Sequence, residues 1–114
     1  MIRQGAQAEK LALQYLQQNG LKLVEQNYHG RFGEIDLIMQ DGTTLVFVEV
    51  RLRRNGNFGG AAASIDTRKQ KRIVSTAQQY LAGLASIPAC RFDVVLMDDI
   101  EQRNMHWLKH AFDA

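Results

Sequence analysis

Cysteine, proline and long apolar runs are scarce in this 114-residue sequence, which has one cysteine and one proline. The lone Cys90 cannot form an internal disulfide, and the first ten residues, MIRQGAQAEK, lack the apolar segment of a signal peptide or membrane anchor. One thiol and no export signal predict the reducing cytoplasm and no membrane partner. A phosphate-binding P-loop and a serine or cysteine nucleophile with a partnered histidine are also missing, which disfavours the hydrolases that depend on them.

The overall composition is that of an ordinary globular protein. Apolar residues make up 46% of the chain and charged residues 23%, which is too apolar for intrinsic disorder. A chain of 114 residues is long enough to bury one core but not to build a second lobe. We therefore expect a single domain over residues 1–114.

Basic residues gather in the middle of the chain. Residues 51–72 contain seven basic residues and one acidic residue, a net charge of +6, so that the total of +2 leaves −4 for the remainder. A face with this charge suits a polyanion, because each phosphate contact releases condensed counterions. The alternative is a solvated basic face that binds nothing in particular.

Hydrophobic periodicity divides the chain into helices and strands. Apolar residues at helical spacing predict a helix over about 4–18 and a second over about 67–84, the latter capped by Asp66. Four short runs predict strands, at 21–28, 35–40, 44–52 and 91–97, with Asp41-Gly42 as a hairpin turn. The tail, 104–112, fits a last strand or a short helix. The order αβββαβ predicts an α/β fold with a mixed central sheet flanked by helices.

Three carboxylates interrupt the apolar hairpin GEIDLIMQDGTTLVFVEVRLRR, residues 33–54. Side chains on a strand alternate between its two faces. Glu34 and Asp36 therefore share one face of the first strand, and Ile35 takes the opposite, apolar face with Leu37. A loop with an even number of residues places Glu49 of the next strand on the same face as the first two acids.

The hairpin register decides which acids meet. A two-residue loop at 41–42 sets Glu34 opposite Glu49, whereas a four-residue loop sets Asp36 there. Either register brings at least two carboxylates within roughly 5 to 8 Å of each other, where like charges repel. A cation must compensate. The candidates are Arg51, in a salt bridge, and a divalent metal, since Mg²⁺ takes hard oxygen ligands.

Several short motifs together resemble a known family. They are GEIDLI, VFVEVR, FGGAA, RKQKR and RFDVV, in that order. This set resembles the YraN family, which is similar in fold to the PD-(D/E)XK nucleases and particularly to the archaeal Holliday junction resolvases. The resemblance runs from about Gly5 to Asp98. It implies a restriction-endonuclease-like αβββαβ core, in agreement with the element order above.

The resemblance also implies a set of metal-site residues. Asp36 takes the place of the motif aspartate, Glu49 that of the motif acid, and Arg51 that of the motif lysine. By this interpretation Asp36, Glu49 and the backbone carbonyl of Val50 hold Mg²⁺ or Mn²⁺ for phosphodiester hydrolysis.

Two further acids and one departure complete the implied site. Glu9 sits where resolvase-like members carry an acid on the first helix, and Glu34 is a candidate for the outer shell of the metal. Arg51 is the departure, because its guanidinium group grips phosphate but stays protonated and cannot act as a general base as a desolvated lysine can. The arginine in place of the motif lysine therefore affects the expected catalysis and leaves the expected nucleic-acid binding unchanged.

The second predicted helix adds a candidate nucleic-acid-binding surface. With Ile73 at the centre of its buried stripe, Lys69 and Gln70 continue the inward face past the edge of the core, and the neighbouring basic residues point away. Cations at a helix N-terminus interact unfavourably with the helix dipole, and an anion bound there compensates for that interaction. We therefore predict the following nucleic-acid contacts: Arg53, Arg54, Arg68, Lys69, Gln70, Lys71 and Arg72.

The function predicted from these features is nucleic-acid binding, with metal-dependent endonuclease activity on DNA, and on branched or flapped DNA in particular. The alternative is a catalytically inactive nuclease-fold protein that binds DNA or serves as an adaptor, and a third interpretation is an RNA-binding module. Metal-dependent turnover distinguishes the first two. A homodimer is compatible with the sequence, but no residue pattern specifies one.

Overall fold

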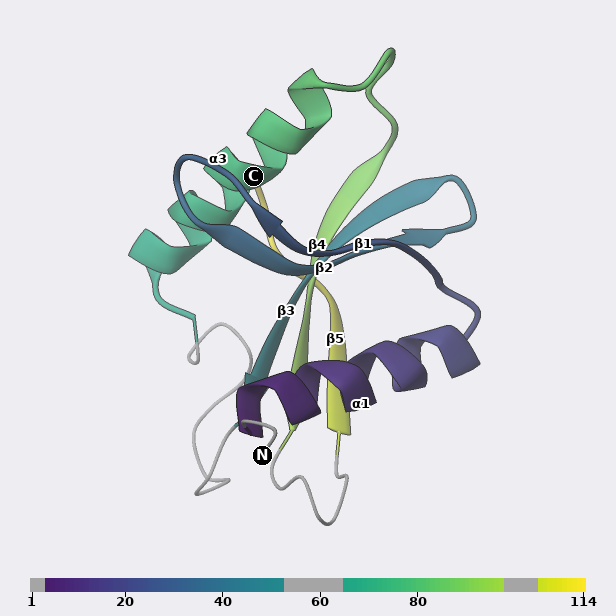
Figure 1. Cartoon of the computed structure of the whole chain (residues 1–114). Coiled ribbons are helices and arrows are strands. Elements are labelled where there is room, and N and C mark those ends of the chain that lie inside the picture. The colour runs from purple at the N-terminus through teal and green to yellow at the C-terminus, as the bar shows by residue number, and fades with distance from the viewer. Residues whose placement is uncertain (1–3, 53–64, 98–104) are drawn as a thin grey trace.

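The computed structural model describes residues 4–52, 65–97 and 105–114, which form a five-stranded sheet between two helices (Figure 1). The elements are α1 (Gln4–Gln18), β1 (Lys22–His29), β2 (Glu34–Asp41), β3 (Thr44–Leu52), α3 (Thr67–Ala82), β4 (Cys90–Met97) and β5 (Met105–Phe112). The predicted α/β class and αβββαβ core are confirmed, and the tail is a strand. Within the described residues, no helix has the length and apolar character that crossing a membrane requires.

The sheet is mixed and follows chain order, β1-β2-β3-β4-β5. Strands β3 and β4 run parallel, and the other neighbouring pairs run antiparallel. The parallel pair needs a crossover connection, which α3 provides by passing over one face of the sheet. This arrangement places the end of β3 beside the start of α3.

The β2–β3 hairpin turns through Gly42, whose φ of 60° lies in the left-handed region that favours glycine. Its last regular cross-strand pair is Leu37 with Val48. One step further along this register sets Asp36 opposite Glu49. Of the two predicted registers, the structure therefore has the one in which Asp36 and Glu49 face each other directly.

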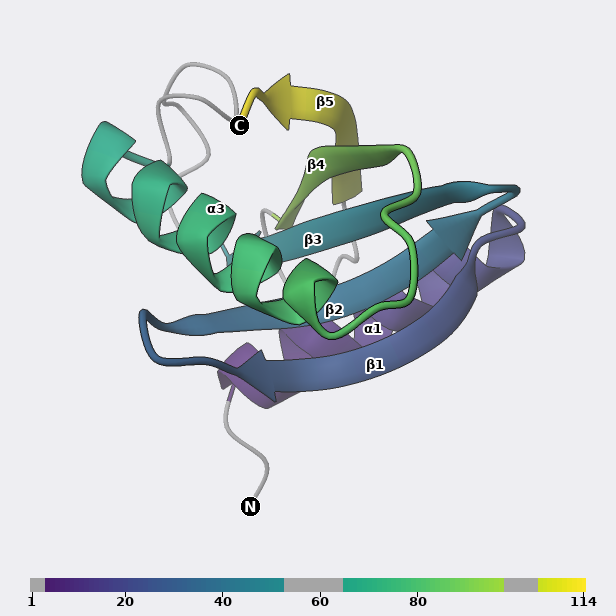
Figure 2. The same ribbon diagram turned by 90° about the horizontal axis from the view of Figure 1, so that it is seen from above.

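Each helix covers one face of the sheet and encloses its own apolar cluster (Figure 2). The cluster under α1 consists of Ala12, Leu16, Leu21, Leu37, Met39, Val46, Val48 and Val95. The cluster under α3 consists of Ile35, Ile38, Leu45, Phe47, Ile65, Ile73, Ala77, Phe92, Val94 and Leu96. Neighbouring residues of β3 enter opposite clusters, as strand alternation requires.

Ile35 departs from the predicted alternation. We expected it on the same face as Leu37, but Ile35 packs in the α3 cluster and Leu37 in the α1 cluster. The prediction is wrong for Ile35, and the change of face falls between Ile35 and Leu37, where β2 leaves β3 while it remains paired with β1. The predicted end of the second helix at residue 84 is also late, since α3 ends at Ala82.

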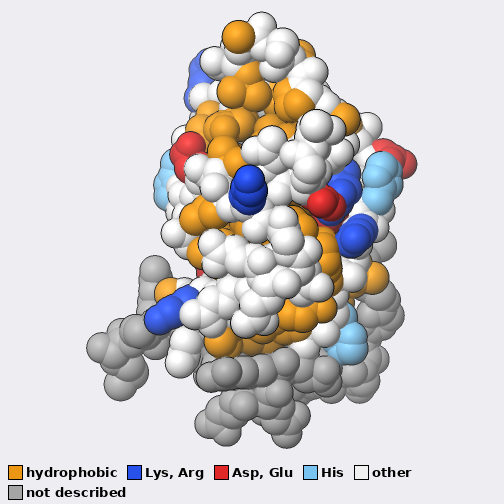
Figure 3. Space-filling view, turned by 90° about the vertical axis from the view of Figure 1, so that its right-hand side faces the viewer, with side chains coloured by type: hydrophobic (Ala, Val, Ile, Leu, Met, Phe, Trp, Pro, Cys, Tyr) orange, Lys and Arg blue, Asp and Glu red, His pale blue; other side chains and the backbone are white. Residues whose placement is uncertain are grey.

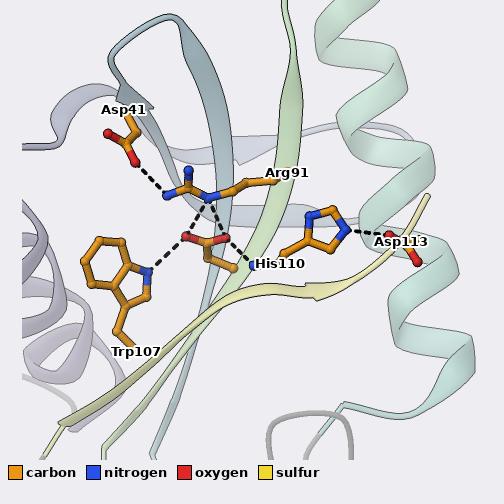
Figure 4. Close-up of polar contacts among 6 residues, drawn as sticks. Asp41, Arg91, Trp107, His110 and Asp113 are labelled. Atoms are coloured by element: carbon orange, nitrogen blue, oxygen red, sulfur yellow. Dashed lines mark hydrogen bonds and ion pairs between the residues drawn. The ribbon is translucent and has the colours of Figure 1, made fainter.

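A buried aspartate joins β4, β5 and the β2–β3 hairpin (Figure 4). Asp93 is 1% exposed. Its carboxylate accepts hydrogen bonds from Nε of Arg91 at 3.0 and 3.2 Å, from Nε1 of Trp107 at 2.9 Å and from the backbone N–H of His110 at 3.0 Å. Nη2 of Arg91 in turn lies 2.9 Å from the carboxylate of Asp41. The charge of Asp93 is therefore compensated from three sides, which is what burial of a carboxylate requires.

We expect Asp93→Ala to lower the free energy of unfolding by about 3 to 5 kcal/mol, because it leaves the guanidinium of Arg91 without its buried partner. Urea unfolding followed by circular dichroism measures the difference. Asp113→Ala is the matched control, since Asp113 forms an ion pair with His110 that is exposed on both sides and should contribute little. Equal destabilisation in the two variants would contradict a structural role for the network.

Candidate active site

A pocket of about 350 Å³ opens at the end of the molecule where both helices begin. The start of β2 and the end of β3 diverge there, between the first turns of α1 and α3 (Figure 1). Six residues that the sequence predicted for the metal site line this pocket: Glu9, Glu34, Asp36, Glu49, Val50 and Arg51. The fold thus gathers in one place acids that are up to 40 positions apart in the sequence.

Asp36 and Glu49 are both buried at this point. Where the regular ladder has ended, the backbone N–H of Val50 donates a 2.8 Å hydrogen bond to Oδ2 of Asp36. The side chain of Asp36 therefore takes the place that a backbone carbonyl of β2 holds further along the ladder. This bond fixes the carboxylate beside Glu49.

The pKa of Asp36 is raised from its ordinary value of 3.8 to about 7. Burial is the largest cause, because a charged carboxylate loses its hydration, and the charge of Glu49 is the second. A hydrogen bond to Glu49 and the charge of Glu34 raise the pKa further, while the N–H of Val50 opposes the rise. The pair therefore retains a proton well above the pH at which an exposed aspartic acid loses it.

Lys69 reaches the acid pair from α3. Its Nζ lies 3.0 Å from Oε2 of Glu49, whose side chain is 7% exposed, whereas that of Lys69 is 39% exposed. The predicted cap is confirmed, since Oδ1 of Asp66 accepts a hydrogen bond from the backbone N–H of Lys69 at 2.8 Å. The capped first turn of α3 thus holds a lysine at the carboxylates, although the sequence motif carries Arg51 at the lysine position.

The other predicted acids lie around this centre. Glu9, on α1, is half-buried in the wall of the pocket. Glu34 is exposed and lies 3.1 Å from Nε2 of His29. In the described part of the chain, no group of three or more His, Cys, Asp or Glu side chains is arranged to hold a metal ion. Protein carboxylates in a metal site here would therefore number two, Asp36 and Glu49.

The predicted nucleic-acid contacts other than Lys69 separate into three sets. Arg53 and Arg54 lie outside the described residues. Gln70 donates from Nε2 to the carbonyl oxygen of Ile65 at 3.0 Å, which braces the start of α3. The remaining basic residues are exposed and form no ion pair with the residues that the structure describes: Arg68, Lys71 and Arg72. Arg72 also lines the acid pocket, so the prediction that it points away from the site is wrong.

Charge is distributed differently at the opposite end of the molecule. There, Lys and Arg side chains stand scattered among acidic, polar and hydrophobic ones (Figure 3). At the pocket end, by contrast, cations gather along α3 next to the acids. The combination of a recessed acid pair and a basic rim occurs at this end.

Sequence reasoning missed Phe32, which lines the pocket and is 56% exposed. It lies in the loop between β1 and β2. The signal was present, because an aromatic residue in the short segment Gly30-Arg31-Phe32-Gly33 has no regular strand in which to be buried.

The fold and site together define an α/β protein with a buried carboxylate pair and a lysine in a pocket rimmed by basic side chains. Residues 8–97 match the model of the Uncharacterised protein family UPF0102. Similar proteins include UPF0102 proteins of Nitrosospira multiformis, 53% identical over 96% of this chain and 92% of the relative, and of Janthinobacterium sp. (strain Marseille), 56% identical over 96% and 87%. The chain therefore belongs to the UPF0102 family, also called YraN, and the resemblance noted from its motifs is confirmed at that level.

We expect the stability of the metal-free protein to fall as the pH rises from about 4 to about 8. The folded state holds the proton of Asp36 up to about pH 7, whereas the unfolded state loses it near 3.8, so each increase of pH in this window favours unfolding. The full shift corresponds to at most about 4 kcal/mol.

Asp36→Asn should remove most of this fall, because asparagine has no proton to lose and can still accept from Val50. Urea unfolding at a series of pH values, in the presence of a chelator, measures both profiles. Glu25→Gln, an exposed change on β1, is the control and should follow the wild type. Parallel profiles for wild type and Asp36→Asn would show that Asp36 titrates normally.

Proposed function

We propose that this protein is a metal-dependent nuclease that hydrolyses phosphodiester bonds in DNA. The observation that carries the proposal is the buried pair of Asp36 and Glu49, held at the base of a pocket whose rim is basic. A buried like-charge pair is destabilising in itself, and such pairs are retained where they bind a cation or perform acid–base chemistry. The αβββαβ core is the one that the resemblance to PD-(D/E)XK nucleases implies.

The donor chemistry fits a hard divalent cation. Mg²⁺ is typically held by one or two carboxylates together with water and substrate phosphate, and Mn²⁺ has similar preferences. Asp36, Glu49 and the backbone carbonyl of Val50 would hold the ion, with Glu9 on the neighbouring wall. When bound, such an ion lowers the pKa of a water molecule and offsets the charge that develops on the phosphate.

Two cations of the chain have separate roles in this proposal. Lys69 neutralises Glu49 in the free protein, and its ammonium group is placed to orient a water molecule or to stabilise the phosphate as charge develops. Arg51 lines the same pocket, and its planar guanidinium group suits bidentate contact with a phosphate. Lys69 on α3 can thus supply the lysine ammonium group that the motif position, occupied by Arg51, lacks.

DNA is the proposed substrate because the basic rim continues along α3. The side chains of Arg68, Lys71 and Arg72 are available for backbone phosphates, which supply most of the affinity in nucleic-acid binding. Branched or flapped DNA is the form that the resemblance to junction resolvases implies.

The catalytically silent binder is the second candidate, and the contact between Lys69 and Glu49 is the observation that favours it. An ammonium group 3.0 Å from Glu49 already compensates part of the charge of the acid pair. A metal ion must therefore compete with Lys69 for that carboxylate. A protein that kept the acid pair neutralised by Lys69, and the basic rim for binding, would have the same geometry.

Isothermal calorimetry with Mn²⁺ tests the metal site directly. Binding should be strongly weakened in Asp36→Ala and in Glu49→Ala, and retained in Glu25→Gln. Because the metal must displace the proton of Asp36, binding at pH 6 should release close to one proton, and binding at pH 8 much less. Repeating the titration in buffers of different ionisation enthalpy measures that number. Identical isotherms for wild type and both alanine variants would remove the metal site from the proposal.

Cleavage of flapped and branched DNA with Mg²⁺ or Mn²⁺ tests the role of Lys69. Lys69→Ala should lower the rate roughly 100-fold with a smaller decrease in binding, since charge stabilisation counts most in the transition state. Arg51→Lys should retain or raise cleavage, and Arg51→Ala should lower cleavage more than binding. Lys109→Ala, a cation stacked on Trp107, is the control. A wild type that binds but never cuts flaps, junctions or single strands would select the silent binder.

A further inference from the structure

Phe32 is a hydrophobic residue with an unusually exposed side chain. Its side chain is 56% exposed, and it is the only aromatic residue among the large, exposed hydrophobic residues of the described chain. Keeping a large apolar side chain in water forgoes the free energy that burial would contribute. Exposure of a single apolar side chain is common at protein surfaces, so the position of this ring at the rim of a pocket is what makes it a candidate for ligand contact.

The loop that carries Phe32 is fastened to α3. The N–H of Gly30 donates to the carbonyl of Gly33 at 2.8 Å, and the N–H of Arg31 donates to Oε1 of Gln79 at 2.8 Å. The loop approaches the helix so closely that a Cβ atom on Gly30 would lie 2.6 Å from that same Oε1. Gly33, with φ of 147°, has a backbone that other residues rarely adopt. The ring of Phe32 is thus presented by a fixed loop.

Basic side chains of α3 lie next to the ring. A shallow depression on the outer side of α3 is lined by Phe32, Arg68, Lys71, Arg72 and Ser75. Phe32 and Arg72 also line the pocket that holds the acid pair. The depression and the pocket are therefore adjacent, and they share the aromatic ring and one guanidinium group as their common wall.

We infer that Phe32 is a stacking platform for an unpaired base, next to the acid pocket. Phosphates of the same strand would lie on Arg68, Lys71 and Arg72. A ring on a short loop can cover the face of a base only where that base is free of its neighbours in the stack, as in a single strand, a flap or a branch point. Aromatic stacking with flanking cations is the general way in which proteins hold single strands without reading their sequence.

This inference rests on the proposed function, because it assumes that the strand beside the acid pair is nucleic acid, and it names the class of that strand. It assigns the subsite to an unpaired nucleotide adjacent to the phosphate in the pocket. Intact duplex would contact the basic residues but not the ring. Discrimination between single strand and duplex is therefore assigned to Phe32, and general affinity to the cations.

Fluorescence anisotropy with labelled oligonucleotides, in a chelator so that no cleavage occurs, tests the platform. We expect Phe32→Ala and Phe32→Leu to weaken binding of a single strand by roughly 5- to 150-fold, the range that removal of one base–aromatic stack gives, with little change for blunt duplex. Phe32→Trp should retain binding, because it keeps an aromatic face. Ile87→Ala, which also removes an exposed hydrophobic side chain, is the matched control and should change neither.

The leucine variant separates stacking from simple apolar contact, since leucine keeps an apolar side chain and removes only the aromatic face. Full binding by Phe32→Leu, or equal weakening on single strand and duplex, would overturn the platform and leave the nuclease proposal intact. Unchanged affinity for single strand in all three Phe32 variants would also overturn the platform. The ligand that covers the ring would then be a protein partner. Absence of binding to any nucleic acid by the wild type would instead remove the proposed function together with this inference.

Salt dependence provides an independent check. Replacing Arg68 and Lys71 together by alanine should flatten the dependence of affinity on salt by about one unit for each phosphate that the variant no longer neutralises. Phe32→Ala should lower affinity without changing that slope, because stacking releases no counterions. A slope that changes with Phe32 would contradict the assignment of the ring to a base.

Discussion

Asp36 and Glu49 are buried side by side where β2 and β3 part, and their carboxylates repel each other. The contacts at this end of the molecule compensate that repulsion. Asp36 cannot lie beside Glu49 unless something holds it there, and the N–H of Val50 does so. Glu49 in turn is compensated by Lys69, which reaches it because Asp66 caps α3 at that point. The ladder, the helix start and the lysine are thus all set by one electrostatic requirement.

A third buried carboxylate in the same sheet, that of Asp93, shows how a carboxylate with a purely structural role is compensated. Asp93 is surrounded by donors from Arg91, Trp107 and His110, so its charge is compensated within the protein. Asp36 instead faces another acid at the wall of a pocket, and its pKa rises to about 7. The difference between an acid whose charge is compensated by donors and one that faces a second acid separates the frame of this protein from its candidate site.

Most of the elements and the acid pair were predictable from the sequence, for reasons that particular residues illustrate. Helices and strands follow from long periodic segments, and Asp41-Gly42 limits the hairpin to two registers. Choosing between those registers needed the structure, because both leave the apolar face of the hairpin buried. The inward position of Lys69 followed from its angle relative to Ile73, but its pairing with Glu49 depends on how α3 crosses the sheet.

What the sequence did not predict depends on contacts between distant segments. The face of Ile35 changes where β2 leaves β3, and the point at which two strands part leaves no periodic signal in the sequence. Two of the partners of Asp93, Trp107 and His110, come from a tail whose period was ambiguous between strand and helix. Phe32 lies in a four-residue loop that is bonded to α3 through Arg31 and Gln79, 48 positions apart, and loops this short have no period to analyse.

The attachment of the β1–β2 loop to Gln79 has a structural consequence. The loop and α3 are joined at Gln79, ten residues along the helix from Lys69, so one helix carries both the anchor of the loop and the lysine that contacts Glu49. The contact that fixes the loop and the contact that neutralises Glu49 therefore lie on the same helix.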